Sequence, residues 1–225
     1  MAELTTVFSN FNTSGNRLLR TEVYDYLRTQ LIEGNLRPGM FISMNELIKK
    51  LDISRTPLRD ALLQLQGEGF VSFLPQRGIR INELSSKDIE NLYDILGALD
   101  SKMLLTVFDQ ITSEKIDEMR KINRQMREYI SEEANNSYFD LNMAFHSVYN
   151  SMSSNQPLRN LIEVVRQRLF VFGKKDWSLK MQELNYSEHS EFLGILEAGN
   201  AVRAADYLRD VHCNYQILKE AESNM

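Results

Sequence analysis

The stretch from Ile53 to Leu65 constrains the fold most, because it combines a helical apolar stripe with arginines near its start. Its apolar residues recur at the i, i+3, i+4 and i+7 spacing that lines one face of a helix. They are Leu58, Ala61, Leu62 and Leu65. Arg55 and Arg59 lie on another face beside Thr56, and the preceding Ser54 is a good N-cap residue. A buried stripe with arginines near the N-terminus is typical of a helix that enters the major groove of DNA.

A second helix is predicted directly before this one. Ser43 and Glu46 have the spacing of a capping box, and apolar residues follow them. Asp52 and Ile53 then leave room for only a short turn. A further amphipathic helix is expected over Leu18–Glu33. A helix, a tight turn and a second helix form the helix-turn-helix arrangement.

Two strands are predicted after the arginine-bearing helix. Phe70–Leu74 and Ile79–Asn82 are apolar runs joined by a short Pro- and Gly-containing loop, which indicates a hairpin. A hairpin in this position is a wing. Its tip carries Arg77 beside a flexible Gly78, which suits contact with phosphates or a minor groove.

Short motifs in this region resemble the GntR family of bacterial winged-helix repressors over about residues 16–84. They are Leu36-Arg37-Pro38-Gly39, Glu46-Leu47, Ser54 to Arg59, Glu68-Gly69-Phe70-Val71 and Arg77-Gly78. The resemblance implies that Arg55, Thr56 and Arg59 face operator DNA and that Gly78 lies at the wing tip. Asn45 stands where a fatty-acid-responsive relative has a DNA-contacting arginine, so that contact is expected to be weaker or differently specific. The predicted DNA contacts are Asn45, Ser54, Arg55, Thr56, Arg59, Arg77 and Gly78.

The 225 residues have room for two domains. We expect a polar, disordered segment over residues 1–15, a winged helix-turn-helix domain over 16–84 and an all-helical domain over 86–221. The net charge of −5 is uneven, since residues 16–84 hold ten Lys and Arg against eight Asp and Glu. DNA binding must therefore depend on where the charges lie more than on their total.

The remaining composition indicates a cytoplasmic protein. No apolar run is long enough for a membrane span, and no basic segment followed by an apolar one marks a signal peptide. The single cysteine, Cys213, excludes an internal disulfide and fits a reducing compartment.

The second half of the chain is predicted to be almost wholly helical. The expected helices are Asp88–Thr106, Ser113–Glu133, Asn136–Met152, Gln156–Phe172, Leu179–Ala198 and Ala201–Ala221. This half resembles the FCD domain of FadR-type GntR regulators, which implies effector binding and dimerisation. The supporting residues are Leu92-Tyr93-Asp94, Ala98-Leu99-Asp100, Phe145-His146, Asn155 to Leu158, Glu188-His189, Leu196 to Asn200, Ala204 and Leu208-Arg209.

By resemblance, many such domains bind a divalent metal through Asp-x3-His followed by His-x21-His. Here the first pair is Asn142 and His146, and the third ligand is His189. The fourth position falls on Val211, with His212 one residue further and about 100° round a helix. One residue of helix distortion would bring His212 inward. Asn142 keeps an oxygen ligand without its charge, and imidazole with oxygen suits Zn, Ni or Mn.

Other interpretations of these residues stay open. His146 and His189 can be hydrogen-bonded core histidines, or they can hold an anionic effector directly. Arg166 and Arg168 lie in an otherwise apolar helix, where at most one can point inward to clamp a carboxylate. The alternative for both is a solvated helix face. Leu96 stands where the first helix of such domains commonly has an arginine.

The sequence thus predicts a mostly α protein that is a ligand-responsive transcription regulator, most simply a repressor. A homodimer would bind a near-palindromic operator with recognition helices about 34 Å apart. A small carboxylic acid would bind among the C-terminal helices. One alternative is a DNA-binding regulator whose helical domain is vestigial and purely structural. The other is a helical metalloenzyme using the three histidines, although no base or nucleophile is evident and no enzyme activity is expected.

Overall fold

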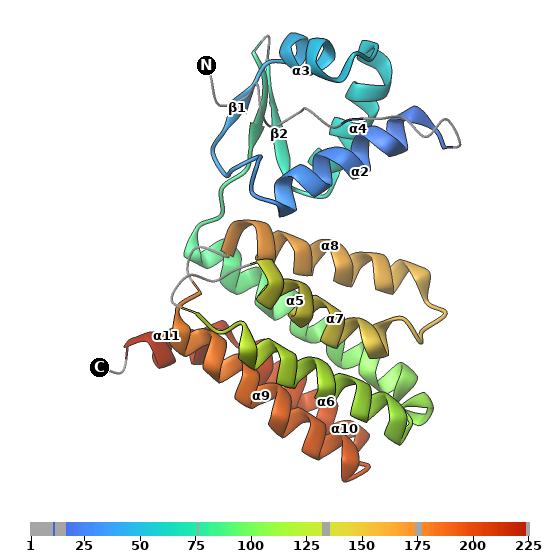
Figure 1. The fold of residues 1–225 in the computed structure, drawn as a ribbon, viewed down its shortest axis with the longest axis vertical. Coiled ribbons are helices and arrows are strands. Elements are labelled where there is room, and N and C mark those ends of the chain that lie inside the picture. The colour runs from blue at the N-terminus through green and yellow to red at the C-terminus, as the bar shows by residue number, and fades with distance from the viewer. Residues whose placement is uncertain (1–10, 12–16, 76, 132–135, 174–176, 224–225) are drawn as a thin grey trace. The chain divides into compact units, whose positions relative to one another are not determined.

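The structure is a computed structural model that describes residues 11, 17–75, 77–131, 136–173 and 177–223. The segment predicted to be disordered, residues 1–15, lies outside the described residues except for Phe11. The chain divides into two compact units, residues 1–83 and 84–225 (Figure 1).

The first unit consists of short helices against a small antiparallel sheet of strand order β1-β3-β2. Its elements are α2 (Leu19–Ile32), β1 (Phe41–Ile42), α3 (Met44–Leu51), α4 (Arg55–Gly67), β2 (Val71–Leu74) and β3 (Gly78–Ile81). The predicted helices and hairpin are present, and β1 was not predicted because two residues carry no alternating pattern. Ile42 of β1 pairs with Ile79 of β3.

The apolar stripe of α4 forms the centre of this unit. Leu58, Ala61, Leu62 and Leu65 are all buried. They pack with buried residues of α2, including Val23 and Leu27. Burying this stripe turns the opposite, arginine-bearing face of α4 to solvent, as the helical period requires.

The turn between α3 and α4 depends on the backbone more than on side-chain caps. Asp52 ends α3 in the left-handed region at φ 50° and lets the chain reverse within a few residues. Ser43 and Ser54 occupy the two N-cap positions, but neither side chain makes a capping hydrogen bond. The predicted Ser43–Glu46 capping box is therefore wrong. Glu46 instead lies 3.7 Å from Lys50, one turn further along α3.

Gly78 is required by close packing rather than by flexibility. It opens β3 with φ +124°, and a Cβ there would lie 2.2 Å from the carbonyl oxygen of Ile42. Its neighbour Arg77 is exposed, whereas Gly78 is buried, and Gln76 lies outside the described residues. The wing therefore presents Arg77 to solvent while Gly78 holds β3 against β1.

We expect Gly78→Ala to destabilise the first unit by about 1–3 kcal/mol, because both its φ and the contact with Ile42 are unfavourable for any side chain. Urea unfolding followed by circular dichroism measures the loss. Gly67→Ala is the matched control, since a Cβ at this helical position meets nothing within 4 Å. The control should be neutral or slightly stabilising. Equal stability of both variants would contradict the packing role of Gly78.

The second unit is a bundle of helices, and its first helix contacts its last. Its elements are α5 (Ser86–Val107), the 3₁₀ helix η1 (Phe108–Gln110), α6 (Ser113–Glu128), α7 (Asn136–Asn150), α8 (Gln156–Gly173), α9 (Leu179–Glu197), α10 (Ala201–Tyr207), the π-helix η3 (Leu208–His212) and α11 (Tyr215–Ser223). Ser85 caps α5 through a capping box with Asp88. The single helix predicted over Ala201–Ala221 is wrong, because η3 and a short break divide it.

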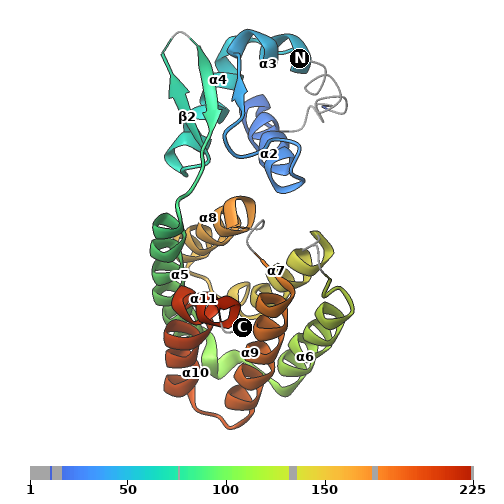
Figure 2. The same ribbon diagram turned by 90° about the vertical axis from the view of Figure 1, so that its left-hand side faces the viewer.

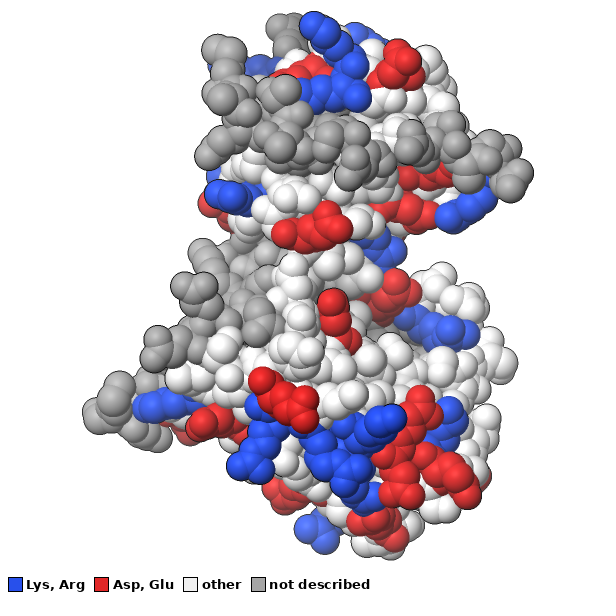
Figure 3. All heavy atoms as spheres, viewed as in Figure 1, with Lys and Arg blue, Asp and Glu red and all other residues white. Residues whose placement is uncertain are grey.

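These helices surround a common interior. Figure 2 looks roughly along the bundle, with α5 beside α8 and α10, and with α9 between α10 and α6. The helix α7 packs against α6 and also contacts α5. On the face shown in Figure 3, basic and acidic side chains lie interleaved over α6 and α9. Arg120 of α6 pairs with Asp117 on its own helix and with Glu197 of α9. That face is a solvated surface, so the chemistry of this unit must be sought inside. No helix in the described ranges is both long and apolar enough to cross a membrane.

Candidate functional site

Most of the predicted DNA-contacting side chains are exposed near the starts of α3 and α4, whereas Arg77 and Gly78 belong to the wing and Gly78 is buried. Asn45 in the first turn of α3 and Arg59 on α4 are exposed, as are the other predicted residues of this turn. These others are Ser54, Arg55 and Thr56. The Arg55 guanidinium donates a 2.9 Å hydrogen bond to Oδ1 of Asn45, which links the start of α3 to the start of α4. Asn45 therefore helps to orient the Arg55 side chain.

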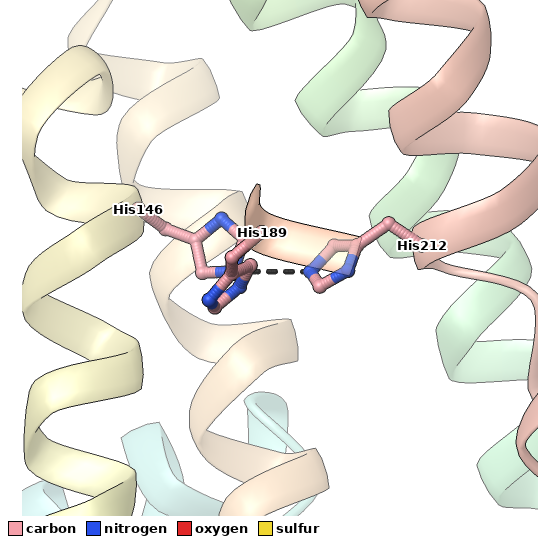
Figure 4. Close-up of side chains that lie close together, drawn as sticks. All are labelled: His146, His189 and His212. Carbon is pink, nitrogen blue, oxygen red and sulfur yellow. Dashed lines mark hydrogen bonds between the residues drawn. The ribbon is translucent and has the colours of Figure 1, made fainter. Parts of the chain in front are cut away.

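Three buried histidines meet inside the second unit. His146 comes from α7, His189 from α9 and His212 from η3, and their side chains point toward one another (Figure 4). Nε2 of His146 lies 3.3 Å from Nε2 of His189 and 3.2 Å from Nε2 of His212. Among the described residues this is the cluster able to hold a metal ion, with ligand atoms within 4.8 Å of one another.

The π-helix explains how His212 reaches the cluster. A π turn closes i→i+5 hydrogen bonds and so contains one residue more than an α turn. Here the amide of Cys213 donates to the carbonyl of Leu208 at 2.9 Å. The extra residue rotates His212 into the interior, where it is 7% exposed, while Val211 is only partly buried. The distortion that the sequence left open is therefore present.

The partners of two histidines fix their tautomers. Nδ1 of His189 faces Oδ1 of Asn123 at 3.2 Å, and the amide nitrogen of Asn123 already donates to Tyr186 and Ser190. Nδ1 of His212 lies 2.9 Å from a carboxylate oxygen of Glu188. Both Nδ1 atoms must therefore donate, which leaves a lone pair on each Nε2.

The third histidine cannot satisfy both of these lone pairs. Nδ1 of His146 lies 3.0 Å from the Tyr149 hydroxyl, which can donate or accept. Even if Nε2 of His146 carries a proton, that proton points to one neighbouring nitrogen and leaves the other facing a bare lone pair. A cation at the centre removes this conflict. A tetrahedral ion bound at about 2.0–2.1 Å separates its nitrogen ligands by roughly 3.3–3.4 Å, close to the two distances from Nε2 of His146 to the other histidines.

The protonation state of the cluster also fits a metal. Burial, together with Arg166 and the neighbouring imidazoles, holds the pKa of His146 well below its ordinary range. Burial and His212 do the same to the pKa of His189. Both imidazoles are then neutral at pH 7, which is the form that binds metal.

A cavity beside the histidines offers a place for a further ligand. About 50 Å³ is open to the centre of a water-sized sphere, room for a few waters or a small anion. Asn142 lines this cavity, and its Oδ1 is buried without a hydrogen-bond partner among the described residues. An unpaired buried carbonyl oxygen one turn before His146 is a suitable fourth donor. Aromatic side chains form much of the remaining wall, namely Tyr93, Phe139, Phe170 and Trp177.

The two arginines of α8 have different surroundings. Arg166 lines the cavity and is 6% exposed, whereas Arg168 is half-buried outside it and interacts electrostatically with Asp88. Arg166 donates a charged hydrogen bond to Asp100 of α5, which is fully buried. Burial lowers the pKa of Arg166, but Asp100, Tyr149 and Cys213 together outweigh burial and raise it. The guanidinium of Arg166 therefore lies at the cavity, and its counterion, Asp100, belongs to α5.

Sequence reasoning missed the residues that orient the cluster. Asn123, Tyr149 and Glu188 come from three helices, and nothing in their own spacing points to the histidines. Two weak signals were present: a carboxylate directly before His189, and Asp100 within an apolar stretch of α5. Polar residues at helix positions that must be buried are the general signal for such partners.

A winged helix-turn-helix joined to a separate helical domain is the architecture of a DNA-binding transcription regulator. Residues 19–81 match the family described as bacterial regulatory proteins, gntR family, and residues 91–211 match the FCD domain. The chain therefore belongs to the GntR family and carries an FCD domain. The family and fold class expected from the sequence are confirmed.

Named relatives agree with this assignment. HTH-type transcriptional repressor RspR of Escherichia coli K12 is 25% identical over 212 residues, covering 90% of this chain and 91% of RspR. The uncharacterized regulator YdhC of Bacillus subtilis is 27% identical over 145 residues, which span 64% of this chain and 65% of YdhC. The solved structure of E. coli McbR/YncC superposes with a TM-score of 0.69 at 19% identity, covering 92% of this chain and 96% of that one, and shares the fold.

Proposed function

We propose that this regulator binds a near-palindromic operator as a homodimer and represses transcription until a small carboxylate binds its helical domain. His146, His189 and His212, with Asn142, would hold a divalent ion such as Zn²⁺, Ni²⁺ or Mn²⁺. The observation that carries the metal site is the convergence of three Nε2 atoms whose lone pairs no proton can fully satisfy. A bacterial DNA-binding regulator acts in the cytoplasm, and no enzymatic role is proposed.

The ion would act as a Lewis acid toward a carboxylate oxygen of the effector. Arg166 lines the same cavity and can bind the second oxygen in the bidentate manner of guanidinium–carboxylate pairs. Aromatic walls favour an effector with an apolar body. These contacts together support a small organic acid as the effector.

The ion pair in the cavity suggests how binding reaches the DNA-binding unit. An effector carboxylate would compete with Asp100 for Arg166, and Asp100 belongs to α5. The helix α5 begins at Ser86, shortly after the first unit ends at Glu83. Release of DNA then requires only that the effector favours one position of α5 over the other.

The test combines native mass spectrometry, elemental analysis and operator binding. A dimer with about one divalent ion per chain, whose operator affinity changes when a small carboxylate is added, supports the proposal. A metal-free protein whose operator affinity and melting temperature no carboxylate changes would favour the vestigial domain instead. Turnover by the helical unit would favour the metalloenzyme.

Arg59→Ala should weaken operator binding by about 1–3 kcal/mol, roughly 10- to 100-fold, without loss of stability. Arg59 is exposed and lies off the buried stripe of α4. Fluorescence anisotropy with operator DNA at fixed salt measures the change. Arg20→Ala on α2, also an exposed arginine of this unit, is the control for the loss of one positive charge. Normal operator binding by the Arg59 variant would show that α4 is not oriented as proposed.

A further inference from the structure

Glu188 is a buried carboxylate whose surroundings call for a positive charge. It is 4% exposed, and one oxygen, Oε2, lies 2.9 Å from Nδ1 of His212. The other, Oε1, is buried with no hydrogen-bond partner among the described residues. A buried carboxylate is strongly unfavourable unless a cation or several donors compensate it.

The nearby charged side chains do not provide this compensation. The cationic side chain of the cavity, Arg166, donates to Asp100. The hydrogen bond that Glu188 makes within the described residues runs to His212. A cation bound to Nε2 of His212 would therefore compensate the charge of Glu188 through the imidazole ring.

The ligands of the proposed metal site lack negative charge, whereas Glu188 lacks a positive partner among the described residues. Three neutral imidazoles and the Asn142 amide bring no negative charge to a divalent ion buried inside the unit. A carboxylate that accepts a hydrogen bond from the far nitrogen of a metal-binding imidazole fixes its tautomer and makes it a stronger donor. Glu188 stands in that relation to His212.

We propose that Glu188 is the positioning residue of the metal site and supplies, through the Nδ1–H of His212, the negative charge that the neutral ligand set lacks. The proposal rests on the metal site of the proposed function. It also explains why a glutamate is tolerated in the interior of α9, because the ion and the carboxylate compensate each other across the imidazole. On this basis the charge of Glu188 matters, not only its shape.

The experiment uses the metal-free full-length protein and measures Co²⁺ affinity by competition with a chromophoric chelator, together with the visible spectrum of the bound ion. Glu188→Gln keeps the size and one acceptor oxygen but removes the charge. We expect it to weaken Co²⁺ binding by about 10- to 100-fold, as for other partners of ligating histidines. The matched control is Glu191→Gln on the same helix, since Glu191 is exposed and accepts a 3.0 Å hydrogen bond from Tyr207. The control should bind Co²⁺ like the wild type.

A rescue variant separates charge from structure. Asn142→Asp places a carboxylate among the ligands themselves, and in the Glu188→Gln background it should restore most of the lost affinity. If Glu188→Gln does not fold, Glu188→Asp keeps the charge but withdraws it from His212 by one methylene, and weaker Co²⁺ binding is then expected.

The outcomes distinguish this proposal from the one it rests on. Absence of Co²⁺ binding by the wild type overturns the metal site and the role of Glu188 together. Wild-type binding with unchanged affinity in the Glu188 variants overturns only the role of Glu188. A loss in Glu188→Gln that Asn142→Asp does not rescue also overturns it, because the effect would then come from structure and not from charge.

Discussion

Asp100→Ala should destabilise the helical unit by about 3–5 kcal/mol, because it leaves the buried guanidinium of Arg166 without its counterion. Asp100 is fully buried and Arg166 is 6% exposed, so water cannot replace the lost partner without opening the bundle. Urea unfolding of the full chain, followed by the fluorescence of the single tryptophan, Trp177, reports on this unit because Trp177 lines the same cavity.

The control for this prediction is a surface ion pair of the same unit. Asp117 pairs with Arg120, but its side chain is 73% exposed. Asp117→Ala should therefore change the free energy of unfolding by no more than about 1 kcal/mol. A loss of similar size in both variants would mean that Arg166 finds solvent or another partner. Partial recovery of the Asp100 variant in acetate would support a carboxylate site beside Arg166.

His212→Ala should reduce the affinity for divalent metal by more than about 100-fold, beyond the range observed for residues that act through a ligand. The substitution removes one of three converging imidazoles and breaks the contact with Glu188. Isothermal titration of the metal-free protein with Zn²⁺ or Ni²⁺ measures the loss.

Val211→Ala provides the matched comparison. Val211 occupies the position that the family spacing assigns to the ligand, but it is only partly buried and packs at the edge of the core. Its truncation should lower stability slightly and leave metal affinity unchanged. The reverse pattern, with Val211→Ala impaired and His212→Ala intact, would refute the assignment of η3.

The sequence was informative wherever a long amphipathic element determined the answer. The stripe of α4 could be predicted because four apolar residues at helical spacing can be buried together in only one orientation. The strand β1 could not, because Phe41 and Ile42 become a strand only by pairing with β3. Likewise, the break in the last predicted helix depends on tertiary packing of η3, and no local sequence period marks a π turn.

The same reason explains which residues of the candidate site could be predicted from the sequence. His146 and His189 were identified as a pair from motif spacing, whereas the position of His212 could not be decided by counting residues along a regular helix. The choice between Arg166 and Arg168 required the rotational phase of α8, which small irregularities at helix ends can shift. The roles of Asn123 and Glu188 could not be assigned from the sequence, because they depend on contacts between helices.

The segment Leu208–His212 also bears on how such chains change over generations. A single added codon in the middle of a helix would normally rotate every later side chain by about 100° and scramble the packing of all that follows. Here the added residue is absorbed within one turn, and the imidazole after it faces the cluster nonetheless. A sequence with one residue more in this turn can therefore still direct its histidine toward the cluster. A motif search that fixes the interval between the last two histidines would discard sequences of this kind, whereas one that admits an interval longer by one residue would retain them.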